Sequence, residues 1–219
     1  MKTKIIIVLT AIILVMGYFL WRQAREMPRK PAAAKRQIIH PAAVTQKPAP
    51  VVAIVMDDFG YNTNSLAALF AIRAQVTLSI LPNLPYSTAI AREARAMGHE
   101  VILHLPLASH RKEVREETDT INSNMAPGAV LAKLDAAIDS VPALKGVSNH
   151  MGSKATEDFR LMELIFGRLK KDGLFFLDSL TSKRSACKAA AKTIGIAYGR
   201  RDIFLDNSTD PESIRKQVL

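Results

Sequence analysis

The stretch Val51-Val52-Ala53-Ile54-Val55-Met56-Asp57-Asp58-Phe59-Gly60 decides the fold. An unbroken apolar run rich in Val and Ile predicts a strand buried on both faces, as in a parallel sheet. Asp57 and Asp58 then fall at the carboxyl edge of that strand, where α/β sheets and barrels place ligands and catalytic groups. Two adjacent carboxylates repel each other, so they call for a metal ion or a basic residue nearby. The alternative is a strand end whose solvated acids cap the next helix.

The composition bounds the class of protein. A chain of 219 residues with 48% hydrophobic residues can bury a sizeable core and fits one domain plus an appendage. Of the formal net charge of +10, residues 1–50 hold nine Lys/Arg against one Glu, which leaves 21 against 19 in the rest. We therefore expect no nucleic-acid partner. The single Cys187 excludes an intramolecular disulfide and a cysteine-based zinc site, so His and carboxylates would have to hold any metal.

The N-terminus carries an uncharged run of 17 residues, Ile5 to Trp21. It is short for a membrane span and long for a signal-peptide core. We interpret residues 1–24 as an uncleaved signal anchor rather than a signal cleaved near 32–34, with a buried core helix as a third interpretation. Residues 25–50, rich in Pro, Ala and Lys, predict a semi-extended linker. More Lys and Arg follow the run than precede it, which by the positive-inside rule favours a cytoplasmic domain.

Residues 51–219 alternate between strand and helix patterns, which predicts an α/β fold with a mainly parallel sheet. After the first strand, further strands are expected at 75–81, 100–104, 146–149, 174–178 and 196–198. Helices are expected at 64–72, 87–97, 127–138, 158–171 and 185–193, with a last helical segment from 211. Residues 108–125 predict an exposed loop.

Residues whose side chains can bind a metal lie at the ends of four of these strands. The carboxyl ends of parallel strands lie at the same edge of a sheet or barrel. The residues are Asp57, Asp58, His104, Asn149, His150 and Asp178. One carboxylate and two imidazoles are a common hydrolytic set for a divalent metal, here Asp58, His104 and His150. Asp57 is then available as the general base, and Asp178 could orient a ligand or the base. A lone histidine is more often a surface or hydrogen-bonded core residue than a metal ligand. The hypothesis of a metal site therefore depends on finding both histidines together with the two aspartates at equivalent strand ends.

Five motifs carry a family resemblance across residues 51–219: IVMDDFGYN (54–62), GHEVILHLPL (98–107), GVSNHMGS (146–153), FFLDSLTS (175–182) and RRDIFLDN (200–207). Together they resemble the divergent polysaccharide deacetylases. The resemblance implies a distorted (β/α) barrel, an extracytoplasmic location, a divalent metal, with zinc the expected one, and an acylated or N-acetylated envelope carbohydrate as substrate. The wider superfamily's Asp-Asp motif implies Asp57 as base and Asp58 as ligand, and its His-x-x-x-His motif maps its first histidine to His104.

The chain departs from the superfamily pattern at three places, one of which is that NHMGS stands roughly where the superfamily carries an Arg-Pro-Tyr-type substrate clamp. The second histidine of His-x-x-x-His would fall at Ala108, and we expect His150 to replace it. The superfamily's last strand, with the histidine that protonates the leaving group, would lie past Leu219, so we expect a barrel that is incomplete at the C-terminus. The motifs also suggest residues that support the ligands or contact substrate: Asn149, Ser153, Asp178, Arg201 and Asp202.

Two functions follow from these patterns. The first is a metal-dependent hydrolase that acts on an envelope polysaccharide or peptidoglycan-type glycan, anchored in the inner membrane with its domain in the periplasm. The second is a non-catalytic, membrane-tethered envelope protein that binds glycan or a protein partner, favoured by Ala108 and by the missing last strand. A cytoplasm-facing, membrane-bound α/β enzyme is a third, weaker interpretation.

Overall fold

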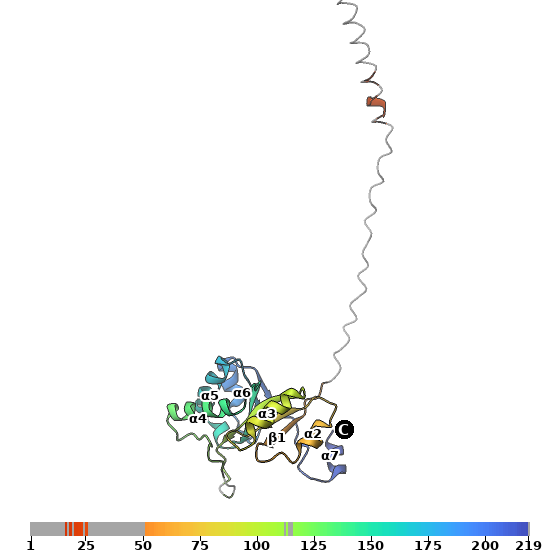
Figure 1. Cartoon of the computed structure of the whole chain (residues 1–219). Helices are drawn as coiled ribbons and strands as arrows, with labels where there is room; N and C mark the ends of the chain where they lie inside the picture. The colour runs from red at the N-terminus through yellow and green to blue at the C-terminus, as the bar shows by residue number, and fades with distance from the viewer. Residues whose placement is uncertain are drawn as a thin grey trace, which may run out of the picture. The chain divides into compact units, whose positions relative to one another are not determined.

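The computed structural model describes residues 51–111, 113 and 116–218, and from the N-terminal part only 16, 18, 20–23 and 25 (Figure 1). The chain divides into two units, Met1–Pro50 and Val51–Leu219. The predicted anchor over 1–24 and linker over 25–50 therefore lie almost entirely outside the described residues. Within the described part, no helix is both long and apolar enough to cross a bilayer.

The described residues of the second unit form one sheet of six strands that are hydrogen-bonded in chain order, each parallel to the next. The strands are β1 (Val55–Phe59), β2 (Thr77–Ile80), β3 (Glu100–Leu107), β4 (Gly146–Met151), β5 (Phe175–Asp178) and β6 (Tyr198–Arg200). The predicted α/β class with a parallel sheet is confirmed. In this order β1 and β6 are the edge strands.

All the helices except the last connect successive strands, and α3 to α6 form an outer layer (Figure 1). The helices are α2 (Leu66–Phe70), α3 (Ser87–Ala96), α4 (Pro127–Ser140), α5 (Phe159–Lys171), α6 (Cys187–Ile194) and α7 (Pro211–Val218), with a short 3-10 helix, η1, at Ala155–Glu157. Parallel crossovers are right-handed, so strands in sequential order carry their helices on one face. The hydrophobic core lies between, where Leu103 and Phe176 of the sheet join Ile165 and Phe166 of α5 in one buried cluster.

The sheet is strongly curved toward its other face. Ser79 on β2 and Ser148 on β4 bring their Oγ atoms to 2.7 Å, although β3 lies between the two strands. In a flat sheet those strands would be about 10 Å apart, too far for two serine side chains to meet. Sequential parallel strands, helices on the convex face and this curvature make the fold barrel-like.

The first strand differs from the prediction. Val51 and Val52 are 92% and 80% exposed and precede the strand, which begins only at Val55 and contains both aspartates. The expectation of a strand buried on both faces was wrong, because of the five residues of β1 only Phe59 is buried. Asp57 and Asp58 therefore lie within β1 rather than beyond its end.

Two further strands are longer than predicted, so His104 and His150 lie inside strands rather than at or after their ends. β3 continues through Pro106 to Leu107, and β4 includes His150 and Met151. The carbonyl of Pro106 accepts a hydrogen bond from the backbone of Ile121, and Ile121 is fully buried. The segment 108–125 is thus not wholly an exposed loop, because its apolar Ile121 pairs with the extended end of β3.

Candidate metal centre

A bulge in β1 places two consecutive carboxylates beside one imidazole. Met56 pairs with Leu78 and Phe59 with Ile80, so three steps along β1 match two along β2 and one extra residue is inserted. Asp58 adopts a left-handed φ of 64° at this point. Successive strand residues normally face opposite sides. Here Asp57 Oδ1 lies 4.0 Å from Nδ1 of His104, and Asp58 Oδ1 lies 3.2 Å from Nε2 of the same ring.

The carboxylate of Asp58 is also close to a second imidazole. Its Oδ1 atom lies 3.0 Å from Nδ1 of His150 on β4. The two imidazole rings meet edge to face, with centroids 5.0 Å apart. Asp58, His104 and His150 thus form one group whose potential ligand atoms all lie within 4.8 Å of one another.

Burial differs sharply within this group. His104 is 4% exposed, because β3 is covered on both faces, while the side chain of Asp58 is 61% exposed. Hydrogen bonds with His104 and then with His150 hold the pKa of Asp58 well below its usual range. The site therefore offers an ionised carboxylate on its open side and imidazole nitrogens from its interior.

The donor set fits a divalent metal such as zinc. Zinc bonds to imidazole nitrogen and carboxylate oxygen at about 2.0–2.2 Å, and a tetrahedral arrangement then separates the ligand atoms by about 3.4 Å. The separations of 3.0 and 3.2 Å between Asp58 and the two rings are close to that spacing. Three protein ligands leave a fourth position open, as catalytic zinc sites do.

The side chain of Asn149 fixes the backbone beside His150. Its Nδ2 donates to the carbonyl of Met151 at 2.6 Å, and its Oδ1 accepts from the backbone N–H of Ser179 at 2.8 Å. Met151 has a left-handed φ of 54°, a conformation that a non-glycine residue adopts at a cost. Asn149 is 1% exposed, so it clamps the ends of β4 and β5 together and is not placed to contact substrate.

Ser153 connects the loops that follow β3 and β4. Its Oγ lies 3.0 Å from Oγ of Ser109 and accepts from the backbone N–H of His110 at 3.0 Å. The His110 ring in turn lies 3.3 Å from Glu157, which also pairs with Arg184 from the loop after β5. Sequence reasoning missed Glu157, whose partners are far apart in the chain.

The remaining candidate residues stabilise the loop after β5 or lie at the surface. Asp178 is fully buried and accepts hydrogen bonds from the Leu180 backbone N–H and from the hydroxyls of Ser185 and Tyr198. The guanidinium of Arg201 donates to the carbonyls of Ser179 and Leu180 and lies 3.6 Å from the ring centroid of Phe204. Asp202 is exposed. None of these three is part of the group around Asp58.

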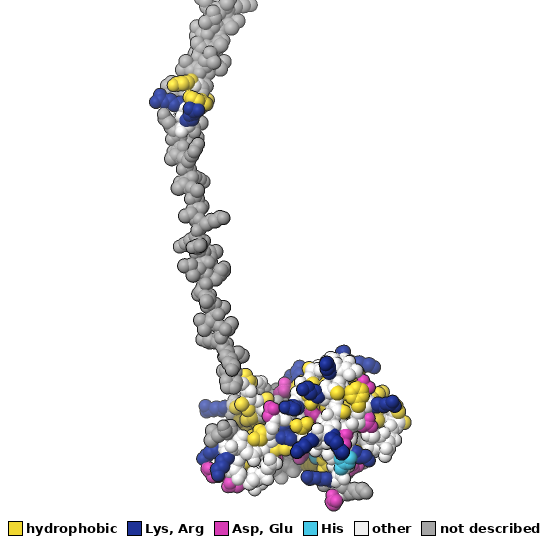
Figure 2. Space-filling view, turned by 180° about the vertical axis from the view of Figure 1, so that it is seen from behind, with side chains coloured by type: hydrophobic (Ala, Val, Ile, Leu, Met, Phe, Trp, Pro, Cys, Tyr) yellow, Lys and Arg dark blue, Asp and Glu magenta, His cyan; other side chains and the backbone are white. Residues whose placement is uncertain are grey.

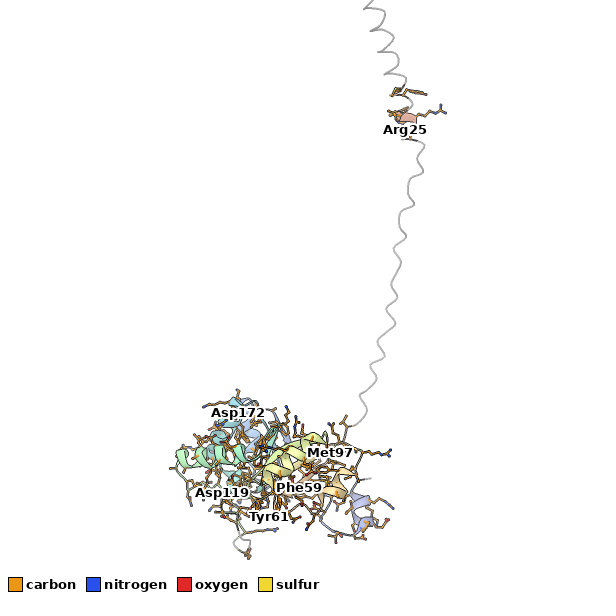
Figure 3. The ribbon with its side chains drawn as sticks, viewed as in Figure 1. Arg25, Phe59, Tyr61, Met97, Asp119 and Asp172 are labelled. Carbon is orange, nitrogen blue, oxygen red and sulfur yellow. The ribbon has the colours of Figure 1, made fainter. Side chains whose placement is uncertain are left out.

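Figures 2 and 3 show the domain from two opposite sides. In Figure 3, Tyr61 and Asp119, which follow the carboxyl ends of strands, lie below Met97 and Asp172, which precede strands. The edge that carries Tyr61 is the one toward which β1, β3 and β4 run. Figure 2 shows histidine surface on the face opposite to that of Figure 1, with Lys and Arg side chains on several sides and Asp and Glu interspersed among them.

Comparison with known proteins identifies the family. The sequence model of the divergent polysaccharide deacetylases matches residues 54–219, so the chain belongs to that family. An uncharacterised protein, ATU2773 of Agrobacterium tumefaciens C58, has a crystal structure that superposes with a TM-score of 0.69 at 25% identity, covering 76% of this chain and 68% of that one. The barrel-like fold and the family assignment agree.

Two relatives are described as uncharacterised proteins. The chain is 33% identical over 187 residues to the protein YibQ of Escherichia coli K12, and 34% identical over 166 residues to a protein of Haemophilus influenzae. The matches cover 84% and 76% of this chain but only 58% and 59% of the relatives. The chain thus spans less than two thirds of the length of these relatives.

Proposed function

We propose that this protein is a metal-dependent hydrolase that removes an acyl group from an N-acetylated or otherwise acylated envelope carbohydrate. The observation that carries the proposal is the convergence of Asp58, His104 and His150 in a member of the divergent polysaccharide deacetylases, with Asp57 beside them. Zinc is the metal we propose, because two imidazoles and one carboxylate form a donor set that suits it. A zinc ion, when bound, polarises a carbonyl and lowers the pKa of its water to about 7.

The side chains around the site have different roles in this proposal. Asp58, His104 and His150 supply the ligand atoms. The bulge leaves the carboxylate of Asp57 next to the group with 34% of its side chain exposed. Asp57 can therefore take a proton from the attacking water without leaving its position, which is the role of a general base.

The test is release of acetate from chitin oligomers or from peptidoglycan by the zinc-loaded full chain. Asp57→Asn should lower the rate by about 100-fold or more, the usual contribution of a general base, while the bound zinc remains. Asp139→Asn, which alters an exposed carboxylate on α4, is the matched control and should keep full activity. Equal rates in the wild type and Asp57→Asn would exclude Asp57 as the base.

A second candidate is a glycan- or protein-binding member of the family without catalysis. One observation favours it: the other described histidines are engaged elsewhere, since His99 stacks on Phe70 and His110 contacts Glu157. Neither is placed to protonate a leaving group, and position 108 holds a buried alanine. Zinc-loaded wild-type protein that binds the oligomers and releases no acetate would establish this function instead.

We also propose that residues 1–24 anchor the protein in the inner membrane, with the domain in the periplasm facing the envelope glycan. The uncharged run Ile5–Trp21 and the family membership support the proposal, whereas the Lys and Arg after that run favour the opposite orientation. Alkaline phosphatase fused after Pro50 should be active if the domain is periplasmic. An inactive phosphatase fusion with an active cytoplasmic reporter at the same site would reverse the orientation.

A further inference from the structure

Ser148 is the hydrogen-bond partner of the most buried imidazole in the group. It lies on β4 directly across from His104 on β3, and its Oγ is 2.8 Å from Nδ1 of that ring. The same Oγ is 2.7 Å from Oγ of Ser79 on β2. All three residues are at most 4% exposed, so the chain of two hydroxyls and one ring is shielded from solvent.

The geometry determines which ring nitrogen has to carry the proton once a metal is bound beside Asp58. Nε2 of His104 is the atom that faces Asp58, and a ligand nitrogen must present its lone pair. The proton of the neutral ring therefore belongs on Nδ1, which needs an acceptor. Ser148 Oγ lies at hydrogen-bond distance, whereas Asp57 Oδ1, at 4.0 Å, lies beyond it.

The hydroxyl of Ser148 can accept from Nδ1–H only if its own proton points elsewhere. Ser79 Oγ can accept the hydrogen bond from Ser148, because a hydroxyl donates one hydrogen bond and accepts others. Both serines are held in place by the sheet, since Ser148 is in register with His104 and Ser79 is in register with Ile102. Partners of this kind orient metal-ligating histidines and select their tautomer.

We propose that Ser148 is a positioning residue for His104: it holds the ring with Nδ1 protonated and Nε2 free to bind a metal, and Ser79 directs the proton of Ser148. The proposal rests on the proposed function, in that a metal is the reason for keeping Nε2 unprotonated. It assigns a role to two serines that carry no charge and lie on none of the loops around the site.

The first test measures zinc affinity of the full chain by competition with a chromophoric chelator. Ser148→Ala should weaken zinc binding by about 10- to 100-fold, the usual cost of losing such a partner. Ser148→Thr keeps the hydroxyl and should bind zinc within about threefold of wild type. Ser79→Ala, the matched control of equal size, removes only the outer hydroxyl and should have a smaller effect than Ser148→Ala. Wild-type affinity in a folded Ser148→Ala protein would overturn the proposal.

The second test needs no metal and separates this proposal from the proposed function. In the metal-free wild type the Asp58 carboxylate, 3.2 Å from Nε2, itself draws the proton of the ring to that nitrogen, so the test uses Asp58→Ala, which removes this acceptor. Nitrogen-15 NMR of the metal-free full chain, at mildly alkaline pH, reports which ring nitrogen of His104 bears the proton. We expect Nδ1–H in Asp58→Ala and in Asp58→Ala/Ser148→Thr, and a shift toward Nε2–H in Asp58→Ala/Ser148→Ala. The same tautomer in Asp58→Ala with and without Ser148→Ala would overturn the role of Ser148, whereas this shift together with a wild type that binds no zinc would overturn only the proposed function.

Discussion

The Oδ1 atom of Asp58 lies 3.0 Å from Nδ1 of His150, which joins the first strand of the sheet to the fourth across β2 and β3. Two features make this contact possible. The sheet curls toward the face that carries Ser79, His104 and Ser148, and a bulge turns Asp58 toward the same face. The metal centre therefore depends on backbone geometry in β1 as much as on the ligand side chains.

Gly60 should be needed to keep that geometry. Its φ of 134° is strained for any other residue, and an added Cβ would lie 2.9 Å from Leu84 Cδ1 and 3.0 Å from Ser87 Oγ. Gly60→Ala should lower the free energy of unfolding by about 1–3 kcal/mol, measured by urea denaturation. The matched control is Gly167→Ala in α5, which has open space around it and should raise stability by about 0.5–1 kcal/mol. A Gly60→Ala protein as stable as wild type would show that the turn tolerates a side chain.

Asn149 should be essential for the end of β4. Asn149→Asp replaces the Nδ2 donor by an oxygen that faces the carbonyl of Met151, so we expect a loss of about 1–3 kcal/mol at neutral pH, measured by denaturant unfolding. Asn122→Asp is the control, because the Asn122 side chain accepts a hydrogen bond from Asn124 and an aspartate can still accept it. Similar stabilities for the two variants would argue against a role of Asn149 in holding the ends of β4 and β5 together.

Glu157 should contribute to stability in a defined range of pH. Hydrogen bonds from Ser182, and further from His110 and Arg184, lower the pKa of Glu157 from 4.5 to about 2. Because the folded pKa is below the unfolded one, its contribution is complete above pH 4.5 and is lost as the pH falls toward 2. The difference in unfolding free energy between wild type and Glu157→Gln should shrink over that range, and Ser182→Ala should reproduce part of the effect. A difference that stays constant across that range would contradict the assignment.

The thiol of Cys187 should be unreactive in the native protein. It is fully buried, and burial together with the nearby Asp178 raises its pKa to about 12, so little thiolate exists at neutral pH. Labelling with an aromatic disulfide should proceed only as fast as the domain unfolds and become rapid in denaturant. Because the chain has one cysteine, the readout is unambiguous, and rapid stoichiometric labelling without denaturant would contradict the burial.

The features of the fold that depend on local sequence pattern could be predicted from the sequence. Strand and helix alternation predicted the α/β class, and polar residues in successive strands predicted that Asp58, His104 and His150 would converge. The start of β1 was not predictable from its apolar run, because Val51 and Val52 are as apolar as strand residues although they are exposed and precede the strand. The bulge at Asp58 leaves no clear local signal except the glycine that follows at position 60. The contact between Ser148 and Ser79 was also missed, since it depends on curvature of the whole sheet.

The zinc content of the purified full chain and three variants decides whether Asp58, His104 and His150 bind a metal. We expect about one zinc per chain in the wild type and little or none in His104→Ala and His150→Ala, since removing one of three ligands leaves an incomplete site. His110→Ala is the matched control, because this histidine contacts Glu157 and is not part of the group around Asp58, so it should keep its zinc. Zinc retained at one per chain in both His104→Ala and His150→Ala would show that these histidines are not the ligands.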